Sequence, residues 1–154
     1  MSSSSFGFET PEDSPGFLLW QTTVLWQRAI KKALDVYHIA HAQFVVLANT
    51  LWFEEHQQTP TQIMIVRMSK LDKMTVSKAL KKLVNDGLVG RVENSLDTRA
   101  KSISLTPQGK QLTITLIARV EAVDETYFSG ISTQERQQLL GLFSKLIGRA
   151  AVNT

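Results

Sequence analysis

The segment that decides the fold runs from Leu71 to Gly109 and reads LDKMTVSKALKKLVNDGLVGRVENSLDTRAKSISLTPQG. Its first half predicts a short helix, because apolar residues recur at the spacing of one helix face, at Val76, Ala79, Leu80 and Leu83. Asp72 is placed to cap the start of this helix, and Gly87 to supply the left-handed residue that ends it.

The second half of the segment predicts a β-hairpin. Residues 91–93 and 102–105 alternate between polar and apolar side chains, as strands with one buried face do. Upstream, residues 61–70 (TQIMIVRMSK) predict another short helix, joined to the basic one by a tight turn. Two short helices followed by a two-stranded hairpin have the order of a winged helix-turn-helix. The expected fold is therefore mainly α with a small β-hairpin wing.

Charge is concentrated in the same part of the chain. From Thr61 to Lys110 there are ten basic and four acidic residues, a net charge of +6. Because the whole chain of 154 residues carries only +3, the remaining residues must carry −3. A basic middle between acidic ends indicates a local surface for a polyanion, although a solvated charged face is the plainer alternative.

The rest of the chain is predicted to be helical. Residues 1–16 are rich in serine and lack periodicity, which predicts a disordered arm. We expect an N-terminal dimerisation helix in 17–40, the winged helix-turn-helix in 41–110, and C-terminal dimerisation helices in 111–154. The terminal helices carry more apolar surface than one reading head can cover, and such a patch usually marks an interface.

Several local signals refine this outline. The first helix has apolar residues at helical spacing, Leu18, Leu25, Ala29, Ala33 and Val36, with Arg28, Lys31 and Lys32 pointing outward. Residues 41–55 are apolar on nearly all sides, which predicts a buried helix. Thr106 before Pro107 predicts a helix start, and Ser132 with Glu135 is the sequence of a capping box.

Several functional classes are excluded or disfavoured by composition. The chain has no run of about 18 apolar residues, so no membrane span is expected, and its N-terminus lacks the features of a signal peptide. Cysteine is absent, which excludes disulfides and thiolate metal sites and fits a cytoplasmic protein. A glycine-rich phosphate loop, a nucleophile motif and a paired-carboxylate pattern are also missing, so we expect neither an enzyme nor a cofactor.

A basic helix of this kind fits the major groove of B-DNA, which is about 12 Å wide. Lys73 and Lys78 would reach hydrogen-bond acceptors on the floor of the groove, and Thr75 would bond to a base or a phosphate. Lys81 and Lys82 would be attracted to phosphates. Double-stranded DNA is therefore the expected partner.

The hairpin would carry a second contact. Its polar tip holds Asp97, Arg99 and Lys101. Arginine is permanently charged and is attracted by the negative potential of a narrow minor groove. We expect Arg99 to enter the minor groove beside the helix, with Asp97, two residues away, orienting its guanidinium.

These motifs together resemble those of the MarR family of bacterial winged-helix transcriptional regulators. Residues 71–89 (LDKMTVSKALKKLVNDGLV) are similar to its recognition-helix segment, and residues 97–109 (DTRAKSISLTPQG) to its wing signature. Residues 42–47 (AQFVVL) are similar to the helix that precedes the reading head. The resemblance covers residues 39–112 by motif and the whole chain by the order of helices.

The resemblance implies a homodimer whose terminal helices intertwine and whose two reading heads bind one pseudo-palindromic operator. Many members of the family are repressors that small aromatic acids or other xenobiotics release. By position it assigns Asp97 and Arg99 to the wing, and it assigns four residues to the recognition helix: Lys73, Thr75, Ser77 and Lys78.

Three features depart from the family pattern. Ala40 stands where a capping threonine is common, so the start of the following helix is less well defined. Ser69 and Lys70 replace a turn of the Leu-Gly type and add charge there. The absence of cysteine excludes the peroxide-sensing branch.

Three alternative or additional functions follow from other residues. Trp20, Trp26 and Trp52 lie on helices that join the reading head to the dimer body, where ligand clefts form, although aromatic residues at helical spacing are more often core. A metal-responsive regulator is conceivable on a set of five residues: His38, His41, Glu54, Glu55 and His56. A protein-interaction module with a vestigial winged helix is the third.

Overall fold

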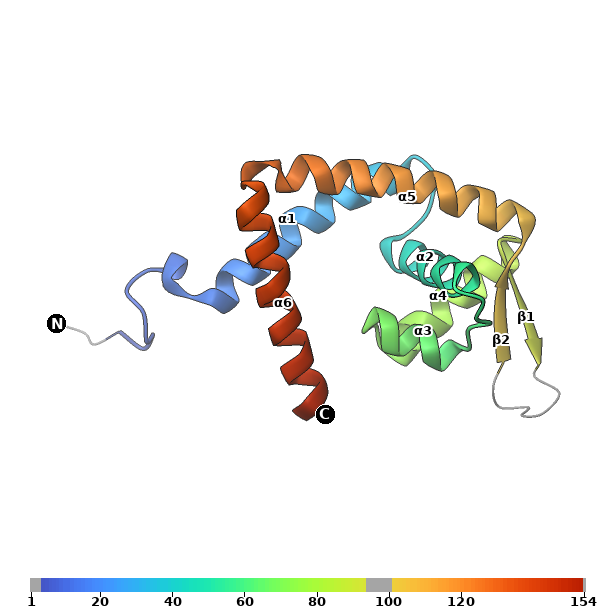
Figure 1. Ribbon diagram of the computed structural model, residues 1–154, viewed down its shortest axis with the longest axis horizontal. Helices are drawn as coiled ribbons and strands as arrows, with labels where there is room; N and C mark the ends of the chain where they lie inside the picture. The colour runs from blue at the N-terminus through green and yellow to red at the C-terminus, as the bar shows by residue number, and fades with distance from the viewer. Residues whose placement is uncertain (1–3, 94–100, 154) are drawn as a thin grey trace. The chain divides into compact units, whose positions relative to one another are not determined.

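The computed structural model describes residues 4–93 and 101–153 (Figure 1). In chain order the elements are η1 (Pro11–Asp13), α1 (Pro15–Asp35), α2 (His41–Glu55), α3 (Gln62–Ser69), α4 (Lys73–Asn85), β1 (Val89–Glu93), β2 (Lys101–Leu105), α5 (Pro107–Tyr127), η2 (Phe128–Gly130) and α6 (Thr133–Asn153). The chain divides into two compact units, Met1–Val120 and Glu121–Thr154. The predicted fold, mainly α with a small antiparallel hairpin, is confirmed.

The core of the first unit collects apolar side chains from every one of its main elements. Ten of them are fully buried: Ile30 and Leu34 of α1, Val46 and Leu47 of α2, Ile65 of α3, Val76, Leu80 and Leu83 of α4, Ile103 of β2 and Leu116 of α5. The central helix is α2, which packs against α1, α3, α4 and β2. Since α2 is covered on so many sides, its predicted burial is confirmed.

The start of α2 shows how the chain manages without a capping side chain at Ala40. The backbone N–H of Ala40 donates to Oε1 of Gln43 at 3.0 Å, which is one half of a capping box. The helix begins at His41 and ends at Glu55, as predicted. The departure at Ala40 therefore leaves the helix boundary unchanged.

Besides the pairing of its two strands, the hairpin makes backbone contacts with the segment before α3. Val89 is opposite Leu105 and Glu93 is opposite Lys101 in an antiparallel register. The N–H of Ile103 also donates to the carbonyl of Pro60 at 2.8 Å, and an isolated bridge joins the residue after Pro60 to β2. The segment between α2 and α3 thus lies along the outer edge of the sheet. The sequence did not predict this pairing, because Pro60 was interpreted only as part of the break after the preceding helix.

The second unit contains the end of α5, η2 and α6. The N–H of Ser132 donates to Oε1 of Glu135 at 2.9 Å, and the N–H of Glu135 donates to Oγ of Ser132 at 3.1 Å. This confirms the predicted capping box, and the hydrogen bond from the Ser132 backbone is the main cause that lowers the pKa of Glu135. Between residues 133 and 150 of α6 no side chain is buried within the chain.

Two boundaries differ from the predictions. The helix predicted from residue 17 begins at Pro15, because the Ser14 hydroxyl accepts from the N–H of Phe17 at 3.2 Å, so the last residues of the predicted arm are helical. The boundary predicted at residue 111 falls inside α5. In α1 the buried residues are Ile30 and Leu34, whereas Leu18 and Leu25 of the apolar pattern are exposed, as is Val36 at the end of the helix.

Within the described part of the chain, no helix is long and apolar enough to cross a membrane.

Candidate nucleic-acid interface

The ends of α4 are both fixed by hydrogen bonds. Oδ1 of Asp72 accepts from the N–H of Thr75 and Oδ2 accepts from the Thr75 hydroxyl, each at 2.8 Å; the backbone bond is the main cause that lowers the pKa of Asp72. At the other end Gly87 has φ of +73°, and the N–H of Leu88 donates to the carbonyl of Leu83 at 3.0 Å. This is a Schellman motif. The predicted cap and stop are confirmed, and the 13 residues between them span about 20 Å.

One face of α4 is apolar and the opposite face is cationic. The apolar face is buried to 5% exposure or less and consists of Val76, Ala79, Leu80 and Leu83. It lies on the side of the helix that packs against α2 and α3. Four exposed residues of the predicted set lie away from the core: Lys73, Ser77, Lys78 and Lys81. At about 100° per residue, Lys78 and Lys81 point opposite the stripe, whereas Lys73 lies only about 70° from the centre of the stripe. Because burial of the stripe fixes the rotation of the helix, it also fixes the direction in which these lysines point.

Two of the predicted contact residues have partners within the chain. Nζ of Lys82 lies 2.9 Å from Oδ1 of Asp86, one turn further on. The hydroxyl of Thr75 donates to Asp72, so it has only lone pairs to offer a second partner. A phosphate oxygen is itself an acceptor, and Thr75 would have to release Asp72 before it could donate to one. Lys73, Lys78 and Lys81 have no ion pair among the described residues.

Two residues of the exposed face were not predicted from the sequence. At about 100° per residue, Met74 and Asn85 both point about 170° away from the centre of the buried stripe. Met74 is 83% exposed, and Asn85 is exposed as well. The same helical spacing that identified the buried stripe would have found both, but the prediction considered charged and hydroxyl side chains alone.

The turn between α3 and α4 is built without glycine. Lys70 has φ of +62°, and its N–H donates to the carbonyl of Val66 at 3.0 Å. The N–H of Leu71 donates to the Ser69 hydroxyl at 3.2 Å. An exposed lysine in the left-handed region therefore stands at the turn where the related family commonly has glycine, and it adds a positive charge next to the start of α4.

The return of the hairpin is held against the end of α4. The Thr106 hydroxyl donates to the carbonyl of Gly87 at 2.7 Å and accepts from the N–H of Gly109 at 3.0 Å. The N–H of Thr106 donates to the carbonyl of Leu88 at 3.1 Å. A Cβ on Gly109 would lie 1.9 Å from that carbonyl oxygen. The first turn of α5 thus sits directly on the backbone after α4, and the position of the hairpin relative to α4 is fixed.

The base of the hairpin is also tied to α2. Oε1 of Glu54 accepts from the N–H of Leu105 at 2.9 Å. Of the predicted wing residues, Lys101 is the first residue of β2 and is exposed. Asp97 and Arg99 lie outside the described residues, so their predicted roles stay predictions.

The three tryptophans predicted for ligand binding have different surroundings. Trp26 meets the ring of His41 edge-on at 5.3 Å, whereas Trp52 stacks on His56 at 3.9 Å. Trp20 is 66% exposed on α1. None of the three lines either of the hollows described next, and their predicted role stays a prediction.

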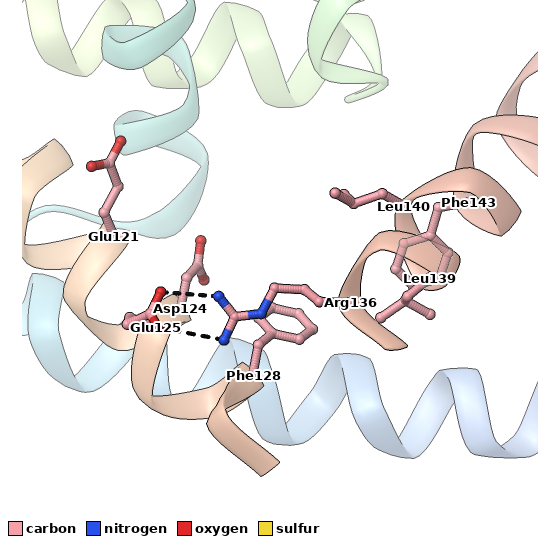
Figure 2. A pocket seen from close by; sticks show the side chains of 8 residues that line it. All are labelled: Glu121, Asp124, Glu125, Phe128, Arg136, Leu139, Leu140 and Phe143. Carbon is pink, nitrogen blue, oxygen red and sulfur yellow. Dashed lines mark hydrogen bonds and ion pairs between the residues drawn. The ribbon is translucent and has the colours of Figure 1, made fainter. Parts of the chain in front are cut away.

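The described residues of each unit form a hollow. In the first unit a hollow of about 490 Å³ lies between the end of α1 and the start of α2, with Lys31, His38 and His41 among its lining residues. In the second unit a hollow of about 370 Å³ lies between α5 and α6 (Figure 2). There the guanidinium of Arg136 reaches back to both carboxylate oxygens of Glu125, at 3.0 and 3.4 Å.

The residues considered for a metal site do not converge. Among residues 4–93 and 101–153 no group of three or more potential ligands lies together. Glu54 serves β2, and Nδ1 of His56 lies 2.6 Å from the carbonyl oxygen of Trp52. These contacts give both side chains a structural role, and nothing in the described residues favours a metal-responsive regulator.

Comparison with known proteins agrees with the architecture. Residues 35–123 match the family model of the ArnR1-like, winged-helix domain. The chain is 35% identical over 128 residues to the uncharacterized HTH-type transcriptional regulator YdcH of Bacillus subtilis (strain 168), covering 83% of this chain and 87% of the relative.

Solved structures give the same fold. BpsR of Bordetella bronchiseptica, whose DNA binding is regulated by 6-hydroxynicotinic acid, matches with a TM-score of 0.81 at 22% identity over 91% of this chain and 97% of its own. S. aureus MepR in complex with DNA matches with 0.80 at 22% identity, over 89% and 98%. A MarR family regulator from Rhodococcus sp. RHA1 matches with 0.79 at 25% identity, over 90% and 96%. The domain match over more than half of the chain and the relative at 35% identity show a winged-helix, HTH-type transcriptional regulator. Together with the match to the Rhodococcus regulator they show that the chain belongs to the MarR family of winged helix-turn-helix transcriptional regulators.

Proposed function

We propose that this regulator binds a specific double-stranded operator, with α4 in the major groove. The observation that carries the proposal is the pair of exposed lysines, Lys78 and Lys81, on the face of α4 opposite its buried stripe, flanked by the exposed Lys73 and Lys82. Lys73 and Lys78 bond to base acceptors, while Lys81 and Lys82 bind phosphates. Ser77 lies on the same face, and Thr75 contributes mainly by holding the first turn of the helix through Asp72.

In the same proposal, the hairpin binds the adjoining minor groove through Arg99, with Asp97 orienting the guanidinium and Lys101 near the flanking phosphates. The support is the fixed attachment of the hairpin to α4 through Thr106 and Gly109. Because the base of the hairpin, residues 89–93 and 101–105, is held at a constant position relative to α4, binding to two grooves would not require this base to be ordered first.

We propose further that the protein acts as a homodimer. Large apolar side chains are exposed on two terminal helices: Phe17, Leu19, Trp20 and Leu25 on α1, and Leu140, Leu142, Leu146 and Ile147 on α6. In a single chain α6 has no buried residue between 133 and 150, and a patch of this size usually marks an interface. A twofold dimer would place two copies of α4 on half-sites about 34 Å apart.

The regulator is proposed to act as a repressor that a small, possibly aromatic, acid releases. The hollow of about 490 Å³ between α1 and α2 supports this by its size and by the cationic and imidazole side chains of Lys31 and His38 in its lining. Lys31 would exchange its present partner, Asp35 at 2.7 Å, for the carboxylate of the ligand. BpsR responds to 6-hydroxynicotinic acid, so that compound is a reasonable first probe. It should lower the affinity for DNA and raise the Tm of the free protein. If the acid has neither effect, it is excluded as an effector.

Selection of bound sequences from a random pool of DNA duplexes tests the function as a whole. The expected result is an enriched pseudo-palindrome whose half-sites are about ten base pairs apart, bound in the presence of heparin. The double variant Lys78→Ala/Lys81→Ala should enrich nothing, whereas Lys145→Ala, which removes an exposed lysine from α6, should enrich the same sequence. Absent or uniform binding by the wild type would favour the protein-interaction module.

A further inference from the structure

The most exposed large apolar side chain among the described residues is on the proposed DNA-binding face. Met74 is 83% exposed and lies in the first turn of α4. The core does not need it, because the buried stripe of α4 is complete with Val76, Ala79, Leu80 and Leu83. Truncating this side chain therefore removes no packing that the structure shows.

The direction of Met74 is set by the same helix rotation that fixes the lysines. It points about 170° from the centre of the buried stripe, and Lys78 and Lys81 lie within about 40° of it. The hydrogen bonds of Asp72 to Thr75 hold the turn from which Met74 projects. A duplex that lies along this face and contacts Lys78 and Lys81 is therefore also faced by the thioether of Met74.

The chemistry of that thioether narrows what it can recognise. A methionine sulfur is a weak acceptor, and the side chain is otherwise apolar and flexible. Most groups on the floor of the major groove are donors or acceptors, which a methionine would desolvate without compensation. The exception is the C5-methyl group of thymine, the apolar feature that the four base pairs present there.

We propose that Met74 reads a thymine methyl group in each half-site of the operator and so contributes to sequence specificity. This inference rests on the proposed function, because it requires α4 to lie in the major groove. It adds a contact that the charged residues cannot make: lysines select acceptors and phosphates, whereas Met74 selects a base by its methyl group. A single exposed apolar residue is common on protein surfaces, so the experiment must detect the methyl group itself.

The test replaces thymine by uracil at one position at a time in the selected operator, which removes the methyl group and leaves every hydrogen-bonding group in place. For the wild-type protein we expect one position in each half-site at which the substitution lowers affinity about fourfold, and about 15-fold when both half-sites are changed. Met74→Ala should bind the thymine operator more weakly than wild type and should not distinguish thymine from uracil at that position.

The control is Val84→Ala, which shortens another partly exposed apolar residue, 38% exposed, near the other end of α4. It should keep the full preference for thymine. Circular dichroism and unfolding of Met74→Ala should match wild type, since no core contact is removed.

Two results would overturn the inference while leaving the proposed function intact: wild-type protein that binds every uracil-substituted operator with unchanged affinity, or a Met74→Ala variant that keeps the wild-type preference for thymine. Failure of the wild type to bind any duplex would instead overturn the proposed function, and this inference with it.

Discussion

Gly109 offers the strictest test of how the hairpin, α4 and α5 are joined. The change is Gly109→Ala, which adds one methyl group at the third residue of α5. In an ordinary helix interior this change stabilises the protein, by about 1 kcal/mol on propensity alone. Here the new Cβ would lie 1.9 Å from the carbonyl oxygen of Leu88 and 2.8 Å from its carbonyl carbon, both of them backbone atoms.

The clash should outweigh the gain in propensity. To reach an ordinary contact distance, the start of α5 must shift away from Leu88 by more than an ångström. That shift would stretch the bond from the Thr106 N–H to Leu88, at 3.1 Å, and the bond from the Thr106 hydroxyl to Gly87, at 2.7 Å. Each is worth about 1 kcal/mol, and overpacking adds about 1–3 kcal/mol. After subtracting the propensity gain, we expect a net loss of about 2–4 kcal/mol in the free energy of unfolding.

The assay is urea unfolding followed by circular dichroism at one fixed protein concentration, because a dimer makes the midpoint depend on concentration. The matched control is Gly141→Ala, a helical glycine of α6 with no atom within 4 Å of its added Cβ. The control should be stabilised or unchanged. If Gly109→Ala is also stabilised, the close approach between α5 and Leu88 does not exist in solution and the fixed wing has no basis.

Lys70→Gly should raise the free energy of unfolding by about 1 kcal/mol, because Lys70 has φ of +62° and glycine adopts this left-handed conformation without strain. If neither Lys70→Gly nor Lys70→Asn is more stable than wild type, the left-handed turn is contradicted. The pKa of Asp72 is lowered in the folded protein, so the carboxylate contributes its full stabilisation above its ordinary pKa of 3.8. This contribution is lost as the pH falls through the lower pKa of the folded state. Asp72→Asn keeps a capping side chain but no titrating group, so it should flatten the dependence of unfolding on pH in that range; curves identical to wild type would count against the cap. Arg99→Ala should weaken operator binding without changing Tm, and unchanged affinity would remove the wing from the proposed contact.

The parts of the fold that the sequence predicted well are those set by local chemistry. The cap at Asp72, the stop at Gly87 and the capping box from Ser132 to Glu135 each depend on residues within one or two turns. The bounds of α2 and the burial of Val76 and its stripe follow from periodicity, which a single dominant face makes unambiguous.

The parts that the sequence did not predict are of two kinds. Some depend on partners that are distant along the chain, and others on a choice between several helix faces that are equally apolar. In α1 apolar residues occupy several faces, so the pattern could not show that Ile30 and Leu34 face the core. Pairing of Pro60 with Ile103 joins segments more than 40 residues apart. The ion pair of Lys82 with Asp86 was within reach of an i, i+4 rule but was overlooked.

The candidate site shows the same division. Its exposed lysines follow from the helix pattern, whereas the attachment of the hairpin through Gly109 requires coordinates, since nothing local distinguishes this glycine from one that ends a turn. The helical spacing places Met74 on the exposed face, but Met74 carries no charge and so was not predicted as a DNA contact.

The salt dependence of operator binding tests the central claim, that the lysine face of α4 contacts the DNA backbone, most directly. For a dimer that neutralises some 6–10 phosphates, affinity should fall about 10³–10⁵-fold between 50 and 200 mM salt. Lys81→Ala removes one proposed phosphate contact from each half-site, so the slope of log affinity against log salt should become shallower by about 2, while Lys145→Ala on α6 should leave it unchanged. An equal slope in wild type and Lys81→Ala, or a wild-type affinity that salt does not change, would contradict the account.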